Sequence, residues 1–404
     1  MELMSGFKET EIGVLPEDWV LKIFSELFEF SGGYSASREQ LSANGYCYLH
    51  YGDIHGSSKT YLDIDVDYLD IPKLNIPLKK ISSKSLLKDG DVVFVDASED
   101  DAGTSKHIVI LNKSNIPFIS GLHTIVAKSK TDDLVRDYKK YCFQSSAIRS
   151  QFLFYAVGTK VSGISKSNIA KLLVPVPPYA EQLKIAEALT DLDALLDSLD
   201  RLIVKKRELK EATVQKLLTG QLRLPGFSEK WKEKRLGELL TYEQPTNYLV
   251  KTNVYDAKFE VPVLTAGKTF LLGFTNETDG IFKNIPTIIF DDFTTASKYV
   301  DFPFKAKSSA MKMLKPKSKD INLKFIYEIM QLINFQVGEH KRHWISEFQN
   351  IEIKVPSELE QNAIAATLLD IDAEIFALVS RREKTLSIKQ GMMQELLTGK
   401  TRLI

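Results

Sequence analysis

Three short motifs resemble parts of enzyme active sites, and each lacks a residue or a setting that its chemistry requires. Residues 266–269, Ala-Gly-Lys-Thr, resemble the end of a nucleotide phosphate-binding loop, but its first glycine would fall at Pro262. Residues 176–179, Val-Pro-Pro-Tyr, resemble the catalytic tetrad of amino-methyltransferases without its leading Asn or Asp, which would accept a substrate amino hydrogen. Residues 352–354, Glu-Ile-Lys, have the form of a metal-nuclease motif but lie in a predicted strand before a helix. The sequence therefore does not predict an enzyme.

Possible metal ligands are also incomplete. Residues 63–67 begin like a calcium loop, with aspartates at alternate positions, but Tyr68 replaces the required glycine and Leu74 the bidentate glutamate. Two pairs of histidines have no cysteine cluster around them: His50 with His55, and His340 with His343. A structural zinc site needs four ligands, so these pairs do not predict one. We expect no metal site in this chain.

Length and composition are those of an ordinary soluble protein with two or three domains. The chain has 404 residues, of which 44% are hydrophobic and 26% are charged. No apolar run reaches membrane-spanning length, and the first residues lack the pattern of a signal peptide. The two cysteines, Cys47 and Cys142, make no disulfide framework. We expect a cytoplasmic protein that has no membrane partner.

Charge is balanced over the whole chain, and one stretch is locally basic. The 53 basic and 53 acidic residues argue against a uniformly positive surface. Between Lys298 and Lys324, however, eight lysines stand against Asp301 and Asp320, with aromatic residues among them. Such a stretch can follow a phosphate backbone, and it can equally be a solvated face. The sequence leaves both interpretations open.

The elements that would position any site are organised by a duplication. Residues 171–224 align without a gap with residues 350–403, at a constant offset of 179 (350 minus 171), and 20 of the 54 positions are identical. Each copy contains Val-Pro near its start, then a Glu-Gln pair, and Leu-Leu-Thr-Gly near its end. Two unrelated helices would share far fewer positions, so we conclude that this segment is duplicated.

Each copy predicts a long helix. Pro177 and Pro178 suit the first helical positions, and no Gly or Pro interrupts the run before Gly220, a suitable left-handed residue after a helix. About forty residues at 1.5 Å each make a helix of roughly 60 Å. One such amphipathic helix would suit the surface of a core, whereas two matching copies favour packing of one on the other.

Apolar residues in both copies alternate steps of three and four, which is the spacing of a coiled-coil seam. The residues are Leu189, Leu192, Leu196, Leu199 and Ile203 in the first copy, and Leu368, Ile371, Ile375 and Leu378 in the second. We expect these residues to form the coiled-coil and partner-docking part of the chain.

Before each long helix lies a variable segment of mixed α and β character. The first, about residues 20–170, has β-branched runs and then a helical pattern, at 91–96, 107–111, 123–128 and 133–154. The second, about residues 228–349, has similar runs and one helix, at 261–265, 287–290 and 323–335. The two segments do not align with each other. We therefore expect an α+β fold with a pseudo-two-fold internal repeat, in four parts: 1–176, 177–224, 225–355 and 356–404.

Several motifs resemble those of the specificity subunit of Type I restriction-modification systems. The repeated Pro-x-x-x-Glu-Gln entry at 177–182 and the repeated ending at 217–220 are similar to that family. So are further short motifs, at residues 15–19, 31–33, 51–54, 88–92, 163–166 and 290–295. The resemblance covers essentially the whole chain. One departure is that the second segment opens without the full Leu-Pro-Glu-Asp-Trp of residues 15–19.

The resemblance implies a DNA-recognition subunit without a catalytic site of its own. In that family two long helices form an antiparallel coiled coil and separate two mixed α/β target recognition domains. Each domain reads one half of a bipartite, asymmetric site in double-stranded DNA. Two methyltransferase subunits dock on the helices and methylate adenine with S-adenosylmethionine, and two restriction subunits use ATP and Mg²⁺ to translocate and cleave DNA. This chain itself would bind no cofactor.

The residues that we expect to contact DNA are polar positions in predicted loops. They are Tyr34, Ser35, Lys106, His107 and Lys160 in the first segment, and Lys268, Thr294, Thr295, Lys298 and Arg342 in the second. An ordinary surface role is open for each of them. A second hypothesis is a two-headed coiled-coil adaptor that joins two proteins and binds no DNA. The duplication alone would allow an adaptor, whereas the resemblance of the variable segments argues against it.

Overall fold

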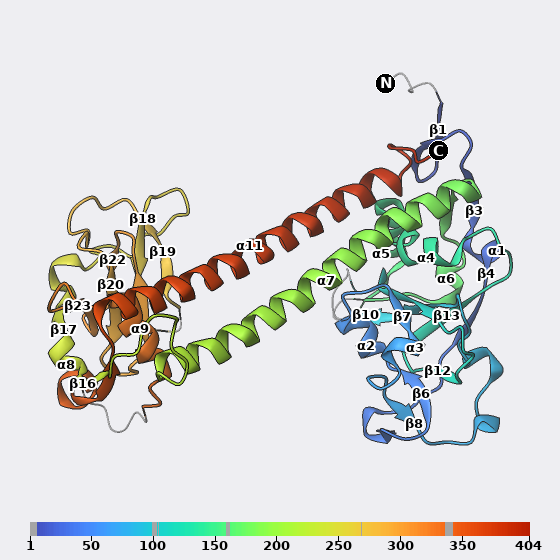
Figure 1. Ribbon diagram of the computed structural model, residues 1–404. Coiled ribbons are helices and arrows are strands. Elements are labelled where there is room, and N and C mark those ends of the chain that lie inside the picture. The colour runs from blue at the N-terminus through green and yellow to red at the C-terminus, as the bar shows by residue number, and fades with distance from the viewer. Residues whose placement is uncertain (1–5, 99–102, 104, 159–161, 268, 336–341) are drawn as a thin grey trace. The chain divides into compact units, whose positions relative to one another are not determined.

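The computed structural model describes residues 6–98, 103, 105–158, 162–267, 269–335 and 342–404 (Figure 1). The chain forms two compact units: the first contains residues 1–198 and 381–404, and the second contains residues 199–380. Each unit therefore combines one variable segment with parts of both long helices. Within the described residues, no helix has the length and apolarity that crossing a membrane would require.

Two sheets form the centre of the first unit. The five-stranded sheet has the order β4 (Phe28–Gly32), β13 (Thr124–Ser129), β9 (Val92–Val95), β11 (His107–Leu111) and β7 (Tyr61–Asp63). The four-stranded sheet has the order β12 (Phe118–Ser120), β6 (Tyr46–Leu49), β8 (Lys73–Leu74) and β5 (Leu41–Ser42). The first three predicted β-branched runs thus form β9, β11 and β13, as expected.

Strand pairs and short helices complete the first unit. The paired strands are β1 (Phe7–Thr10) with β2 (Gly13–Pro16), β3 (Val20–Ile23) with β15 (Leu173–Val176), and β10 (Ala97–Ser98) with β14 (Ser162–Gly163). The α-helices before the repeat are α1 (Phe24–Leu27), α2 (Tyr51–Gly56), α3 (Ile64–Asp67), α4 (Arg136–Cys142), α5 (Ser146–Tyr155) and α6 (Lys166–Ile169).

Strand β9 explains where the core of the first unit lies. All four of its residues are buried, and alternate side chains enter different clusters: Val92 and Phe94 lie in one, Val93 and Val95 in the other. A strand that is covered on both faces reads as a continuous apolar run, because neither face meets water. The Phe94 ring meets the Phe143 ring, which follows α4, at 5.3 Å.

The helical pattern at 133–154 forms two helices, so its prediction as one helix was wrong. The break falls at Ser145, whose side chain accepts a hydrogen bond from Ile148 N and caps α5. Serine stabilises a helix more at this position than in its interior. Tyr138 and Tyr141 of α4 and Phe152 of α5 all reach the same core, which is why the apolar spacing looked continuous.

The second unit repeats this plan on a smaller scale. Its four-stranded sheet has the order β17 (Leu240–Glu243), β23 (Met311–Pro316), β20 (Thr287–Asp291) and β21 (Ser297–Val300). A three-stranded sheet has the order β19 (Leu271–Thr275), β18 (Val261–Leu264) and β22 (Lys305–Ala306). The remaining strands and helices are β16 (Lys232–Arg235), which pairs with β24 (Glu352–Val355), and α8 (Leu236–Leu239), α9 (Leu323–Leu332) and α10 (His343–Ser346).

The central sheets of the two units share one topology, although the variable segments do not align in sequence. β17-β23-β20-β21 corresponds to β4-β13-β9-β11, with antiparallel neighbours throughout. In each case the first strand directly follows a four-residue helix, α8 or α1. The strand registers place Phe290 at the position of Phe94, and both rings are fully buried. The two variable segments are therefore versions of one architecture.

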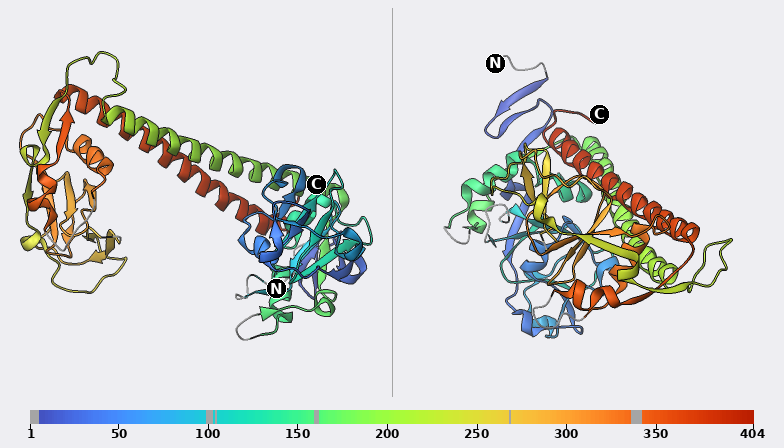
Figure 2. Two further views of the ribbon diagram at one scale, coloured as in Figure 1. Left: turned by 90° about the horizontal axis from the view of Figure 1, so that it is seen from below. Right: turned by 90° about the vertical axis from the view of Figure 1, so that its left-hand side faces the viewer.

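The long helices α7 (Tyr179–Leu218) and α11 (Glu358–Leu396) run antiparallel within each unit (Figure 2). In the first unit Lys389 Nζ lies 2.5 Å from Asp193 Oδ1, and in the second Lys210 Nζ lies 2.5 Å from Asp372 Oδ1. The duplication makes these two ion pairs equivalent. The predicted helices are confirmed, and Gly220 has the expected left-handed conformation, with a φ of 73°.

The predicted apolar stripe is buried to different degrees along its length. Five of its residues are buried: Leu189, Leu196, Leu199, Ile203 and Leu368. The other four are partly buried: Leu192, Ile371, Ile375 and Leu378. Leu189 belongs to the core of the first unit and Leu368 to that of the second. The long helices thus pack into the hydrophobic core of each unit as well as against each other.

Candidate nucleic-acid interface

The glutamine of the repeated Glu-Gln pair fixes each variable segment to a long helix. The buried Gln182 side chain donates to the carbonyl oxygens of Asp133 (2.8 Å) and Pro177 (2.9 Å), and accepts from Val135 N (2.8 Å). The loop held in this way leads into α4. Gln361 makes the equivalent three bonds before α9, with Asp320, Pro356 and Asn322. The motif therefore has a positioning role in both units.

The glutamate of the same pair joins distant parts of the chain. Glu181 is 3% exposed and accepts hydrogen bonds from Trp19 Nε1 (2.9 Å) and from Arg402 Nε (2.7 Å) and Nη2 (2.9 Å). Arg402 also bonds to Asp18 (2.7 Å), which holds the pKa of that carboxyl below its ordinary value. The second unit repeats this cluster with Glu360, Trp231 and Arg223. Although the second segment lacks most of the opening motif, it retains the tryptophan that makes this contact.

An aspartate at the end of the central strand ties together one edge of each sheet. Asp96 N donates to His123 O (3.2 Å), and Asp96 O accepts from Ile164 N (2.8 Å). Asp292 makes the same two bonds in the second unit, with Ala310 and His343. Ile164 and His343 differ by 179 (343 minus 164), which is the offset of the repeat. We call the end of each sheet marked by Asp96 or Asp292 the loop edge.

Three of the residues predicted to contact DNA lie at the loop edge of the first unit. Tyr34 N donates to Ser120 O (2.7 Å), beside the turn at 121–123, and its side chain is partly exposed. Ser35 follows it and is exposed. Lys106 directly precedes β11, and its Nζ donates to His55 O (2.6 Å). Two further predicted residues lie outside the residues that the structure describes: Lys160 and Lys268.

His107 has a different environment from its neighbour Lys106. Its side chain is 3% exposed, and its ring packs against Phe94 and Phe143, with centroids 5.6 and 5.2 Å away. Burial lowers the pKa of His107 to about 4, because the charged imidazolium would lose its hydration. The structure thus places His107 in the core, away from the surface where a DNA contact would form.

Three predicted residues come together at the loop edge of the second unit. Thr294 and Thr295 lie in the turn between β20 and β21, and Thr295 has a φ of 58°. Arg342 is exposed and directly precedes His343, whose backbone N bonds to Asp292 O. These side chains come from segments that are far apart in the sequence. In both units the segment that precedes the repeat therefore bonds to the end of the central strand, through His343 in the second unit and Ile164 in the first.

The basic stretch between residues 298 and 324 contains both buried and exposed lysines. Lys305 pairs with Glu277 (2.8 Å) and Lys312 with Asp292 (2.7 Å), and both lysine side chains are 1% exposed. These two buried pairs belong to the fold. Lys298, in contrast, is exposed on β21 next to the turn. The stretch is thus not a continuous track for phosphates, and Lys298 remains its candidate for a DNA contact.

The loop edge of the first unit also carries an aromatic cluster that we did not assign to DNA from the sequence. Tyr51, at the start of α2, has its ring near three imidazoles: His50 (centroids 4.5 Å apart), His55 (6.1 Å) and His123 (5.3 Å). Burial, and then the charge of Arg38, lower the pKa of His50. The Tyr-Gly-Asp-Ile motif at 51–54 was the available signal, but His123 is distant in sequence.

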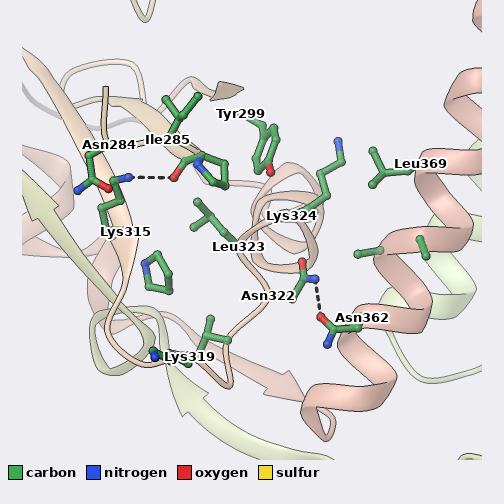
Figure 3. A pocket seen from close by; sticks show the side chains of 15 residues that line it. Asn284, Ile285, Tyr299, Lys315, Lys319, Asn322, Leu323, Lys324, Asn362 and Leu369 are labelled. Atoms are coloured by element: carbon green, nitrogen blue, oxygen red, sulfur yellow. Dashed lines mark hydrogen bonds between the residues drawn. The ribbon is translucent and has the colours of Figure 1, made fainter. Parts of the chain in front are cut away.

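A pocket of 720 Å³ in the second unit lies away from the loop edge (Figure 3). Its lining includes Pro286, which precedes β20, whereas the loop edge follows β20. Lys315 Nζ donates to Pro286 O (3.0 Å), and Asn322 Nδ2 donates to Asn362 Oδ1 (2.7 Å). The pocket is therefore bordered by α9 and α11 and is distinct from the candidate interface.

The described residues offer few groups for covalent or metal chemistry. Among them, no group of three or more His, Cys, Asp or Glu side chains could hold a metal ion. Cys47 and Cys142 are buried, and burial raises the pKa of both thiols. A thiol with a raised pKa is a poor nucleophile, because the thiolate is the reactive form. What both loop edges offer instead is polar side chains that can donate and accept hydrogen bonds.

Comparison with known proteins gives consistent matches. The family described as Type I restriction modification DNA specificity domain matches residues 16–205 and 228–387. The Type I restriction enzyme EcoR124I/EcoR124II specificity subunit of Escherichia coli is 43% identical over 196 residues, which are 42% of this chain and 48% of that subunit. The chain thus spans about half the length of this relative.

Two other matches extend over nearly the whole chain. The putative type I restriction enzyme MjaX specificity subunit of Methanocaldococcus jannaschii is 23% identical, with 98% of this chain and 97% of that protein covered. The S subunit of a Type-I restriction-modification system from M. genitalium is 15% identical and has a TM-score of 0.59, with 98% of both chains covered. The second match is evidence for the fold.

Proposed function

Because the chain belongs to the family of Type I restriction-modification specificity subunits, we propose that it is the DNA-recognition subunit of such a complex. Each unit reads one half of a bipartite, asymmetric site in double-stranded DNA. The long helices set the distance between the half-sites and dock two methyltransferase subunits. Two restriction subunits complete the assembly, and S-adenosylmethionine, ATP and Mg²⁺ are used by the partner subunits.

The observation that carries this proposal is the equivalence of the two loop edges. Both follow the same central strand and are tied by the same aspartate bonds, yet their polar side chains differ. Tyr34 and Lys106 stand at the first edge, and Thr294 and Arg342 stand at the second. One architecture with two different polar surfaces suits two different half-sites, because base edges are distinguished by the pattern of donors and acceptors that meets them.

Exposed apolar side chains on α11 support a docking role for the long helices. Leu369 is 49% exposed and Phe376 is 72% exposed, both in the second unit. The equivalent positions of α7 are engaged within the first unit: the Thr190 hydroxyl contacts Tyr141 (3.1 Å), and Asp197 pairs with Lys59 (2.7 Å). Large apolar side chains that are exposed at a surface can be buried by contact with another protein.

The direct test is an electrophoretic mobility shift with the full chain and its partner methyltransferase. A duplex that carries the recognised site should shift at a lower protein concentration than duplexes with either half-site scrambled. A two-headed adaptor that binds no DNA predicts no sequence-dependent shift. Equal affinity for all duplexes in the presence of the methyltransferase would contradict the proposal.

The proposal that the long helices set the distance between the half-sites is tested by insertions made in both helices at once. Four residues inserted after Ser198 and four before Arg381 should lengthen the paired helices by about 6 Å, close to two base pairs at roughly 3.4 Å each. Matched insertions retain the pairs of Asp193 with Lys389 and of Lys210 with Asp372. Methylated sites from cells should then keep both half-sites and gain one or two base pairs between them. An unchanged distance with full activity would remove the spacing role.

A further inference from the structure

The turn at 121–123 holds His123 in a conformation that histidine rarely adopts. Its φ is 57°, in the left-handed region that favours glycine. Hydrogen bonds fix the turn: Gly121 N donates to Leu49 O (2.9 Å), and Leu122 N donates to the Tyr48 hydroxyl (3.1 Å). Glycine adopts this conformation without strain, whereas histidine does not. Backbone strain that the surrounding structure maintains is concentrated at binding and catalytic sites.

The imidazole of His123 is held on two sides and is open on a third. Its ring meets the Tyr51 ring edge-on at 5.3 Å, and its Nδ1 lies 3.3 Å from Asp96 Oδ1. That carboxylate oxygen is buried and has no hydrogen-bond partner, so the neutral ring directs its hydrogen from Nδ1 towards this acceptor and keeps a lone pair on Nε2. No hydrogen bond joins His123 Nε2 to any residue that the structure describes, and the side chain is 49% exposed. Nε2 is therefore available to a donor outside the chain.

The second unit has no counterpart of this side chain. Ala310 O accepts from Asp292 N as His123 O accepts from Asp96 N, so alanine occupies the equivalent position. A side chain that the shared architecture required would be expected in both units. Its presence in one unit alone fits a part in reading one of two different half-sites.

Two cations flank the cluster of Tyr51 and His123. Lys106 Nζ donates to His55 O, and the Arg38 side chain, 61% exposed, pairs with Asp53 (3.0 Å). Cations at the rim of a DNA-binding surface contact phosphates and fix its register, whereas groups between them reach the base edges. A ring nitrogen with a lone pair can accept a hydrogen bond there from an amino group, such as adenine N6 or cytosine N4.

We propose that His123 is a specificity-determining residue, whose Nε2 accepts a hydrogen bond from an amino group on a base edge in the half-site read by the first unit. Tyr51 and Asp96 are positioning residues that hold the ring. This inference rests on the proposed function and deepens it, because it assigns one base contact to one side chain. Both the methylated sequence and the stability of the fold can therefore be used to test it.

The test uses the full chain with its partner methyltransferase and measures methylation rates on duplexes with single base-pair changes in either half-site. The variant His123→Gly suits a φ of 57° and removes the imidazole, and His123→Asn is a second variant that tolerates this conformation. Asn115→Gly is the matched control, because Asn115 also has a positive φ (53°). Asn115 comes after the last residue of β11, whereas the loop edge lies at the first residue of that strand.

We expect His123→Gly to unfold at the same temperature as the wild type or a higher one. Its discrimination at one base pair of the first half-site should fall about tenfold, with the second half-site unchanged. Asn115→Gly should discriminate like the wild type. Unchanged discrimination in His123→Gly would overturn the inference while leaving the proposed function standing. A lowered unfolding temperature in both His123 variants, with losses in both half-sites, would also overturn it.

A wild-type complex that methylates every duplex equally would instead contradict the proposed function, and the assignment of His123 would fall with it. The two failures are therefore distinguishable, because one is seen in the wild-type protein and the other in the variants.

Discussion

Replacing Arg402 by alanine should destabilise the first unit, although this residue lies near the C-terminus of the chain. Arg402 makes two hydrogen bonds to Glu181 and one to Asp18, and Trp19 donates to the same glutamate. In Arg402→Ala the Glu181 carboxylate, only 3% exposed, loses its cation and keeps the Trp19 hydrogen bond. An unpaired buried carboxylate is costly because it has exchanged water for a low-dielectric surrounding.

The size of the effect follows from the burial of the pair. Removing one partner of a buried ion pair costs roughly 3–5 kcal/mol. Since the Arg402 side chain is 21% exposed, water can partly replace it, and we expect about 3 kcal/mol. This loss corresponds to a roughly hundredfold faster exchange of those amide hydrogens that exchange through unfolding of the first unit.

Hydrogen exchange measured by mass spectrometry separates the two units within one sample. Arg402→Ala should accelerate exchange at the start of α7 and in β3, leaving residues 225–355 unchanged. Arg223→Ala is the matched variant, because Arg223 makes the equivalent bonds to Glu360, and it should affect the second unit instead. Arg207→Ala, at an exposed position of α7, is the control and should change neither. Faster exchange in the second unit of Arg402→Ala would show that Arg402 does not act on the first unit alone.

Further predictions concern single side chains. Because burial lowers the pKa of His107 from 6.5 to about 4, the unfolded chain binds a proton that the folded chain does not. The free energy of unfolding should therefore fall by about 3 kcal/mol as pH drops from about 6.5 to 4; denaturant titration of His107→Leu should show a smaller fall. Gln182→Ala and Gln361→Ala should each lower the unfolding free energy of its own unit by about 2 kcal/mol in denaturant titrations; equal loss in both units would contradict this. Lys298→Ala should reduce the salt slope of DNA binding by about one, and an unchanged slope would remove Lys298 from the interface.

The duplication made the long helices and their joints predictable. Two copies with the same offset constrain the helix limits, the Glu-Gln pair and the glycine after each helix, because each feature has to suit both copies. The structure adds what the Glu-Gln pair does: Gln182 bonds to backbone, and Glu181 bonds to Trp19 and Arg402. Their roles depend on partners that the folding of the chain brings close, so the sequence alone could not supply them.

The shared architecture of the variable segments could not be predicted from residue identities. β9 and β20 are equivalent through backbone hydrogen bonds and through the alternation of buried faces, and many apolar residues satisfy both conditions. The loop edge was predicted in part. Tyr34 and Lys106 lie at this edge, and their contact with DNA stays a prediction. His107 was expected in a loop but is buried, because a histidine at the first position of a strand can face either side. His123 was missed because its φ is not visible in a sequence.

We propose that each unit reads its own half of a bipartite site. The most direct measurement replaces residues 20–170 with the corresponding domain of another member of this family and sequences the methylated sites in cells that carry the matching methyltransferase. One half-site should change to that of the donor protein, while the other half-site is retained. A change in both half-sites, or in neither half-site of an active complex, would contradict this proposal.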